Sequence, residues 1–195
     1  MLRIIFADIL GGVVYHAWVF MSWMTFGVHE GTMGALPNPN AVTTALKSQN
    51  LESGVYTRPW PSNNEEAMDP ESAFSKRHAA GPLFTIYYRA EGAPSMSVNM
   101  IVRGLVLNIA SAGLAACLLS CTAGCCCNYF GRVGFVLGLG LFAAIVTHGA
   151  YWNWMGFPAH YTLMFVVDLA VGWTLAGLVM AALVKPRPAA AATAV

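Results

Sequence analysis

Several ionisable and amide side chains of this sequence lie inside apolar stretches, where they are the residues best placed to do chemistry: Asp8, His16, Arg103, Asn108 and Asp168. A charged side chain at the centre of a membrane helix costs about 2.5 kcal/mol or more, so such residues are usually paired or functional. At a rise of about 1.5 Å per residue, Asp168, His16 and Asn108 fall at similar depths. We expect Asp8, which is nearer an end, to be interfacial.

Arg103 is the cation that we expect to neutralise Asp168, because a long arginine side chain can reach inward or extend toward the headgroups. The pattern predicts an ion pair of Arg103 with Asp168 or Glu30 that fixes the register of the helices. The alternative is a pathway for protons or ions through Asp168 and His16. We assign no catalytic residue.

Four of the five histidines lie in or beside the apolar stretches. Three of them, together with one glutamate, fall at the same end of these stretches and form a candidate metal site: His29, Glu30, His148 and His160. Neutral imidazole is a common ligand of copper, zinc and haem iron. None of these residues has the spacing of one helical turn that makes a metal motif specific. We therefore expect no cofactor, with haem or copper as the alternative.

The five cysteines gather over a short segment: Cys117, Cys121, Cys125, Cys126 and Cys127. They include no C-x-x-C pair of the kind that binds zinc or iron–sulfur clusters, so we interpret them as small apolar packing residues at a helix end. Lipid attachment is an alternative. The sequence also contains no P-loop, nucleophile elbow, HExxH or dinucleotide fingerprint, which argues against familiar enzyme classes.

The elements that must position these side chains are membrane helices, because 57% of the residues are hydrophobic and only 10% are charged. A span needs about 20 apolar residues. We predict four spans: Ile4–Phe26, Val98–Ser120, Val133–Ala150 and Tyr161–Val184. The predicted fold is an all-α transmembrane four-helix bundle with a small α/β extramembrane insertion between the first two helices. Its parts are residues 1–30, 31–97, 98–184 and 185–195.

The positions of Lys and Arg predict the orientation, because cytoplasmic flanks carry more of them than outer ones. Arg3, Arg132, Lys185 and Arg187 flank one side, whereas the connection from His148 to His160 contains neither residue type. We expect both termini to be cytoplasmic and residues 31–97 to be outside. In a bacterial inner membrane this insertion would be periplasmic.

Within the insertion, the residue pattern predicts the order helix, strand, helix, strand. The predicted elements are a helix capped by Asn40 over 40–48, a strand at 54–58, a helix opened by Asp69–Pro70 and running to Ala79, and a strand at 83–88. The two strands suggest a small sheet. Residues 61–66 between them are polar and rich in turn formers, so we predict a solvated loop.

Gly134 and Gly138 form a GxxxG step in the third span, which allows another helix to approach closely. The simplest interpretation is packing within this chain. Contact with another subunit is the alternative.

Three stretches together resemble those of uncharacterised four-span bacterial inner-membrane proteins: residues 26–30, residues 54–56, and residues 151–158 continuing to Gly172-Trp173. The resemblance implies the four-span topology. It implies no activity, cofactor or site residue.

The absence of enzyme motifs, the small-residue helix faces and the structured insertion favour an accessory or scaffolding subunit of a larger membrane complex of energy conversion or transport. The expected partners are the lipid bilayer and other integral-membrane subunits, and a net charge of +1 argues against nucleic acid. One alternative is a metal- or haem-binding redox protein that uses the outer histidines. The other is a small proton- or ion-coupled transporter.

Overall fold

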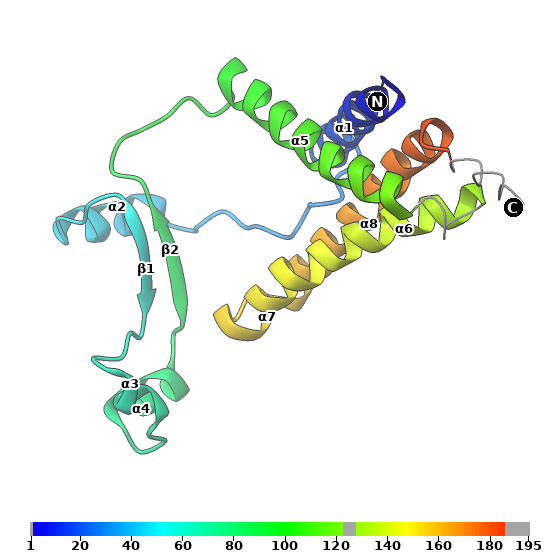
Figure 1. The fold of residues 1–195 in the computed structure, drawn as a ribbon. Helices are drawn as coiled ribbons and strands as arrows, with labels where there is room; N and C mark the ends of the chain where they lie inside the picture. Colours follow the sequence, from blue (N-terminus) through cyan, green and yellow to red (C-terminus); the bar gives the residue numbers. More distant parts are fainter. Residues whose placement is uncertain (1, 123–127, 186–195) are drawn as a thin grey trace, which may run out of the picture. The chain divides into compact units, whose positions relative to one another are not determined.

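The computed structural model describes residues 2–122 and 128–185 and divides the chain into two compact units (Figure 1). One unit comprises 1–33 together with 96–195, and the other is the insertion, residues 34–95. The first unit contains four helices that are long and apolar enough to cross a membrane. They are α1 (Leu2–Met24), α5 (Val98–Thr122), the continuous segment Tyr129–Met155, and α8 (Ala159–Leu183). The predicted integral membrane protein with four membrane helices is supported at this level.

The third span is longer than the predicted Val133–Ala150 and is not a uniform helix. It consists of α6 (Tyr129–Ala144), the π-helical segment η1 (Ile145–Gly149) and α7 (Ala150–Met155). Asn128 begins it earlier than expected, because its side chain accepts a hydrogen bond from the backbone N–H of Gly131. Gly156 ends it in the left-handed conformation, with φ of 67°.

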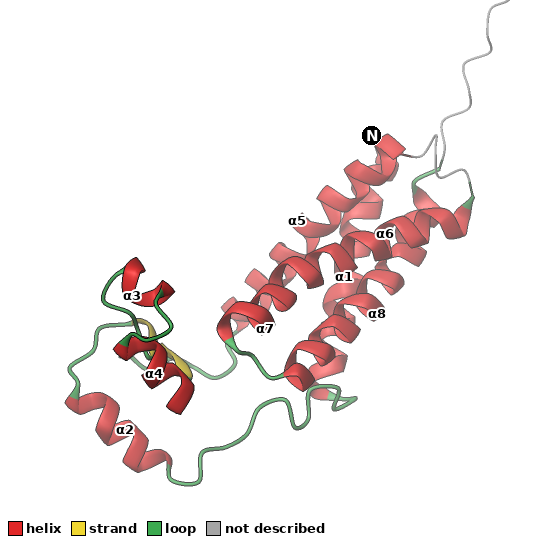
Figure 2. Cartoon of the chain, turned by 90° about the horizontal axis from the view of Figure 1, so that it is seen from below, coloured by secondary structure: helices red, strands yellow, loops and turns green. Residues whose placement is uncertain are grey.

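Close approach between the helices depends on glycine. α1 packs against α5 and α8, and α6 packs against α8, as Figures 1 and 2 show. A Cβ on Gly12 would lie 2.5 Å from the Cα of Ile109 on α5. A Cβ on Gly140 would similarly lie 2.6 Å from the Trp173 ring. In lipid, where apolar burial does not drive helices together, such close packing is a main source of association.

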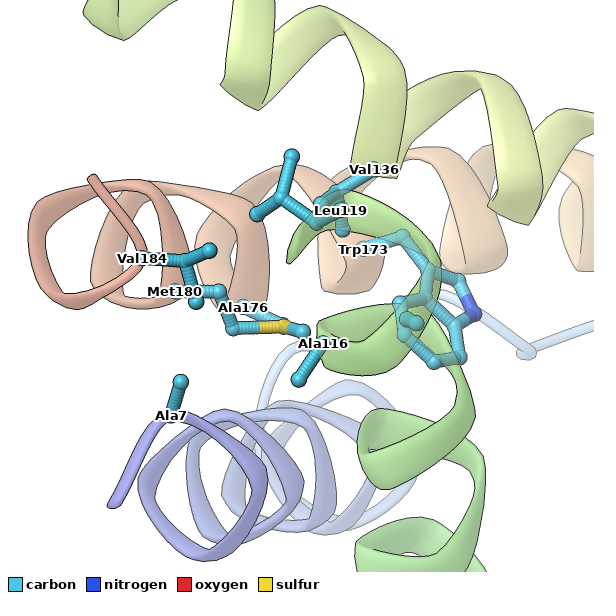
Figure 3. Close-up of a cluster of buried hydrophobic side chains, with 9 residues drawn as sticks. Ala7, Ala116, Leu119, Val136, Trp173, Ala176, Met180 and Val184 are labelled. Atoms are coloured by element: carbon cyan, nitrogen blue, oxygen red, sulfur yellow. The ribbon is translucent and has the colours of Figure 1, made fainter. Parts of the chain in front are cut away.

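All four spans contribute to one hydrophobic core (Figure 3). Its members are mostly small or aliphatic: Ala7 from α1, Ala115, Ala116 and Leu119 from α5, Val136 from α6, and Trp173, Ala176, Met180 and Val184 from the α8 region. Because alanine dominates the α1 and α5 contributions, the helix backbones come close together here. The arrangement is compatible with the predicted four-helix bundle.

The start of α6 is tied to the end of α8. The buried guanidinium of Arg132 donates from Nε and Nη2 to the Ala181 carbonyl, at 3.2 and 3.1 Å. The Tyr129 hydroxyl donates to the Leu178 carbonyl at 2.8 Å. The last four carbonyls of a helix have no partner within it, so the Arg132 bonds satisfy such an acceptor at the α8 terminus. Together with the Tyr129 bond to the preceding turn of α8, they place both ends on the same side of the bundle.

The insertion contains three short helices and a two-stranded sheet. The helices are α2 (Pro39–Ser48), α3 (Asn64–Met68) and α4 (Ala73–Ala80), and the strands are β1 (Gly54–Arg58) and β2 (Phe84–Tyr88). β1 and β2 are antiparallel, with Gly54 opposite Tyr88 and Arg58 opposite Phe84. The predicted small α/β insertion with a two-stranded sheet is confirmed.

Three local predictions within the insertion were wrong. Residues 61–66 are not all loop, because Asn63 caps α3 by accepting a hydrogen bond from the Glu66 backbone N–H. The helix expected from Asp69–Pro70 begins later, at Ala73, because Ser72 supplies the cap. Asn38 rather than Asn40 caps α2. For α2 and α4 the sequence offers two neighbouring cap residues, and the fold uses the one that was not predicted, whereas no cap was predicted within 61–66.

Candidate functional site

Asp168 is buried in the membrane unit, with 6% of its surface exposed. It lies nine residues after the start of α8, or about 13 Å along that helix. The Trp18 indole N–H donates to its backbone carbonyl at 3.0 Å. One turn further along α8, the missing side chain of Gly172 makes room for the rings of Tyr15 and Trp18, which a Cβ there would meet at 2.6 and 2.7 Å. Aromatic residues of α1 therefore cover this stretch of α8.

His29 reaches the same place from a turn rather than from a helix. α1 ends at Met24, and the backbone N–H of Val28 then donates back to the Ser22 carbonyl at 3.2 Å. Gly27, with φ of 62°, allows the reversal, because a side chain there would be strained. The Thr32 hydroxyl donates to the His29 carbonyl at 2.7 Å. The turn thus carries the His29 imidazole into the bundle, where the residue is only 7% exposed.

His29 and Asp168 form the central pair of the site. The imidazole Nε2 lies 3.4 Å from Asp168 Oδ2, and the two side chains are 3% and 8% exposed. This distance is beyond the usual range of an N–H···O hydrogen bond but within that of an ion pair, which the two residues form when the imidazole carries the proton. The imidazole also stacks on Trp23, with ring centroids 4.0 Å apart, and lies 4.8 Å from the Phe165 ring. An imidazolium here would be stabilised by a carboxylate and by an aromatic face together.

Three further polar atoms at this level are buried without a hydrogen-bond partner: Ser22 Oγ, His29 Nδ1 and Asp168 Oδ1. Ser22 is fully buried and continues the stripe of Tyr15 and Trp18 along the face that α1 turns toward α8. Buried polar groups in folded proteins nearly always have a partner, so unpartnered ones near an ionisable pair are typical of a site that binds something.

The charge balance of the pair determines what it can do. With one proton shared between them, His29 and Asp168 have no net charge, whether the proton is on the imidazole or on the carboxyl. Adding a second proton or removing the first leaves a net charge in a buried, low-dielectric place, which is costly. The pair can therefore bind and release a proton only with a change in its surroundings.

A second polar contact joins α1 to α5. His16 Nδ1 and Asn108 Nδ2 lie 3.0 Å apart, and Gly104 lies beside the imidazole, since a Cβ there would be in ordinary contact with its Cε1 at 3.5 Å. Two turns toward the start of α1, the Asp8 carboxylate lies against Gly113, and its Oδ1 is buried without a hydrogen-bond partner. Asp8 was expected near the headgroups, and its carboxylate faces α5.

The polar residues predicted from the sequence thus fall into separate groups. His16 meets Asn108, but among the described residues Arg103 makes no ion pair with Asp168 or with Glu30. Arg103 is exposed, and its Nε donates to the Asn99 carbonyl at 3.2 Å. The physical reason is that the two residues lie on different partners of α1. Arg103 belongs to α5 and Asp168 to α8, and each of these helices packs against α1. His29 takes the place that we expected Arg103 to fill.

The four candidate metal ligands are not brought together either. Within residues 2–122 and 128–185, no three His, Cys, Asp or Glu side chains are grouped so as to hold a metal ion. His29 contacts Asp168, and His148 stacks on Phe165 with centroids 4.6 Å apart, while Glu30 and His160 are exposed. On α5, Cys117 and Cys121 are free thiols. Cys125, Cys126 and Cys127 lie outside the described residues.

Sequence reasoning missed the pairing of His29 with Asp168. It identified both residues, but it placed His29 at the outer surface because it extended the first span to Phe26. The signal that was available is Gly27, which marks a chain reversal immediately before the histidine.

The geometry described above is the basis for interpreting the site. The chain was compared with models of known protein families, with curated proteins and with solved structures, and no match was found.

Proposed function

We propose that this chain is a small integral-membrane protein that moves protons across the bilayer, with His29 and Asp168 as its proton-binding centre. The observation that carries the proposal is the burial of both side chains at 3.4 Å between aromatic rings, with Asp168 Oδ1 still unpartnered. Such a pair is costly in free energy in an apolar bundle, so its presence favours a functional role for the two residues. The proposal refines one of the alternatives raised by the sequence and replaces Arg103 with His29 as the partner of Asp168.

The surroundings of the pair favour a proton over a metal ion. The groups around it are aromatic or neutral: Tyr15 and Trp18 from α1, Trp23 beside the imidazole, and Phe165 with His148 behind it. Among the described residues, no lysine or arginine forms an ion pair with Asp168. A proton therefore changes the charge of this centre without competition from a fixed cation.

The α1–α5 contacts support transfer toward the other end of the bundle. His16, paired with Asn108, and Asp8, with its unpartnered Oδ1, are titratable groups two helical turns apart on the same side of α1. Each lies beside a glycine of α5, Gly104 or Gly113. Ordered water next to such glycines would complete a path for protons.

We further propose a bacterial inner-membrane location, with both termini in the cytoplasm and residues 31–97 in the periplasm. Arg3, Arg132 and Lys185 all lie near the end of the bundle where α6 begins and α8 ends, as cytoplasmic flanks require. His29 and Asp168 would then exchange protons with the periplasmic side.

The proposal is tested with purified protein in liposomes that contain a pH-sensitive dye and carry an imposed pH gradient. We expect the wild-type chain to dissipate the gradient and Asp168→Asn to lose at least about tenfold of this rate, because the amide cannot exchange a proton. Thermal unfolding in detergent must show that the variant is folded.

Arg103→Gln is the matched control, since Arg103 is an exposed charge in a membrane span without an ion pair among the described residues. It should conduct protons like the wild type. No proton movement by folded wild-type protein, or equal rates for wild type and Asp168→Asn, would contradict the proposal.

A second candidate is the accessory or scaffolding subunit of a larger complex, and one observation favours it. A Cβ on Gly134 or Gly138 of α6 would meet nothing within 4 Å, and both residues are exposed. By contrast, Gly140 and Gly177 lie in close contact with Trp173 and Val136. The exposed step therefore remains available to a helix of another chain, and Gly138→Leu should release such a subunit during purification in mild detergent.

A further inference from the structure

We propose that Asp168, with Trp23 and Phe165 as walls, forms a binding site for a small planar organic cation that carries N–H donors, and that the His29 side chain is the built-in occupant of this site. Imidazolium and guanidinium ions are the simplest members of this ligand class. The proposal concerns the carboxylate that we also assign to proton binding. The experiment below measures ligand binding and not proton movement. The cation site can therefore be disproved while the proton-binding function stands, and the reverse.

The walls of the site have the features by which proteins recognise organic cations. The Trp23 and His29 rings are nearly parallel, with an interplanar angle of 15° and centroids 4.0 Å apart. Phe165 closes another side at 4.8 Å, and the Asp168 carboxylate is the counter-ion at 3.4 Å. A cation over an aromatic face gains more when it is desolvated, and this position is almost completely buried.

The occupant is carried by a turn that lies outside the membrane helices. His29 lies in the turn that follows α1, between Gly27 and Gly31, whose φ values are 62° and 76°. Two hydrogen bonds hold the turn: the Val28 N–H donates to the Ser22 carbonyl, and the Thr32 hydroxyl donates to the His29 carbonyl. The imidazole can therefore leave without unwinding α1 or α8. The walls and the carboxylate would remain, because they belong to those helices.

Unpartnered atoms indicate that His29 does not use the whole site. Asp168 Oδ1 and Ser22 Oγ are buried and accept no hydrogen bond. An imidazole attached to the chain presents Nε2 to Asp168 Oδ2, and its geometry is limited by the turn. A free ion with several N–H donors could satisfy both carboxylate oxygens, as guanidinium does in bidentate pairs.

The decisive experiment removes the occupant and supplies it from solution. In detergent, His29→Gly should bind added imidazolium, and its unfolding temperature should rise by a few degrees in a saturable manner, because a ligand that binds only the folded state stabilises it. The wild type should show no such rise, since its own imidazole fills the site. The double variant His29→Gly, Asp168→Asn should also show none, because the counter-ion is gone.

His160→Gly is the matched control, because it removes an exposed histidine from the start of α8. Its unfolding temperature should be unchanged by imidazolium. An equal rise in this control, or no rise in folded His29→Gly, would overturn the proposal.

If His29→Gly does not yield folded protein, the wild type is titrated with guanidinium at concentrations too low to unfold it. Displacement of His29 from Trp23 should give a saturable change in tryptophan fluorescence that is absent in Trp23→Phe and in Asp168→Asn. A wild-type signal without saturation, or one that persists in Asp168→Asn, would reject the site.

Discussion

Two ion pairs of almost equal length lie in the two units of this molecule. His29 and Asp168 are 3.4 Å apart in the membrane unit with 3% and 8% of their side chains exposed, whereas Lys76 and Glu71 are 3.3 Å apart in the insertion with 67% and 84% exposed. In water the attraction between such charges is largely screened, but in a buried place it is strong and each charge depends on the other. The distance between the charged atoms alone therefore says little about what a pair contributes to stability.

The same contrast extends to how each unit is held together. The membrane unit relies on glycines and alanines that let helices touch, with few side-chain hydrogen bonds between them. The insertion has no buried residue in its helices and relies on caps and polar contacts around Glu66. Substitutions should consequently act through packing and buried charge in one unit, and through local hydrogen bonds in the other.

The largest effect is expected from Asp168→Ala, which leaves His29 buried without its counter-ion. We expect a loss of about 3 kcal/mol in the free energy of unfolding, the lower end of the cost of breaking a buried pair. Asp168→Asn keeps the shape and a polar partner and should cost about 1 kcal/mol. Denaturant unfolding in detergent measures both. Equal losses for the two variants would show that a polar partner of the same shape does not compensate for the lost carboxylate.

Gly12→Ala should have the next largest effect. The added Cβ would lie 2.5 Å from the Cα of Ile109, and a helix backbone cannot move aside without separating α1 from α5. We expect a loss of about 2 kcal/mol by overpacking. Gly138→Ala is the matched control, because its Cβ meets nothing within 4 Å; stability there should be unchanged or higher by up to about 1 kcal/mol, since alanine favours the helix over glycine. Coincident curves for both variants would remove the close approach as an explanation.

Acid should loosen the insertion before it affects the helix contacts of the membrane unit. The Glu66 carboxylate accepts hydrogen bonds from the backbone N–H groups of Ser62 and Phe74 and lies near Arg77, and these contacts hold the pKa of Glu66 below its ordinary value. Their stabilisation is complete above the unfolded-state pKa and is lost as the pH falls through the lower folded-state pKa. Hydrogen exchange of residues 64–80 should accelerate over that range. The acceleration should be absent in Glu66→Gln, which is already without the charge.

The smallest effect is expected from Glu71→Gln. Its partner Lys76 is mostly in water, so the loss should be about 0.5 kcal/mol or less and should vanish at high salt. Denaturant unfolding at low and high salt measures it. A loss comparable to that of Asp168→Ala would abolish the contrast drawn between the two pairs.

The elements of this fold were largely predictable from residue order, since apolar length alone predicts the four membrane helices and β-branched and aromatic runs predict β1 and β2. The residues at which the elements begin and end were less predictable. Asn38, Asn63 and Ser72 form caps that compete with equally good neighbours, and the choice depends on tertiary contacts. Composition likewise does not reveal a π-helical turn within the third span.

The candidate site was only half predictable. Asp168 was identified because a carboxylate is costly in any apolar span, wherever its boundaries fall. Its partner was not, because nothing in linear spacing relates a residue of the turn after α1 to a residue of α8. The pairing depends on the reversal at Gly27, and on Gly172, which lets Tyr15 and Trp18 lie close to the helix.

The π-helical segment Ile145–Gly149 has a consequence for tolerance to changes in chain length. A π turn accommodates one more residue than an α turn, so it shifts the phase of all later residues of the same span by about 100° relative to an uninterrupted α-helix. In this phase Tyr151 stacks on Phe157, with centroids 5.4 Å apart, and His148 stacks on Phe165. Deletion of one residue at the start of this segment would restore regular α-helix and rotate both His148 and α7 away from these contacts. A single-residue deletion should therefore disturb this span more than most substitutions within it.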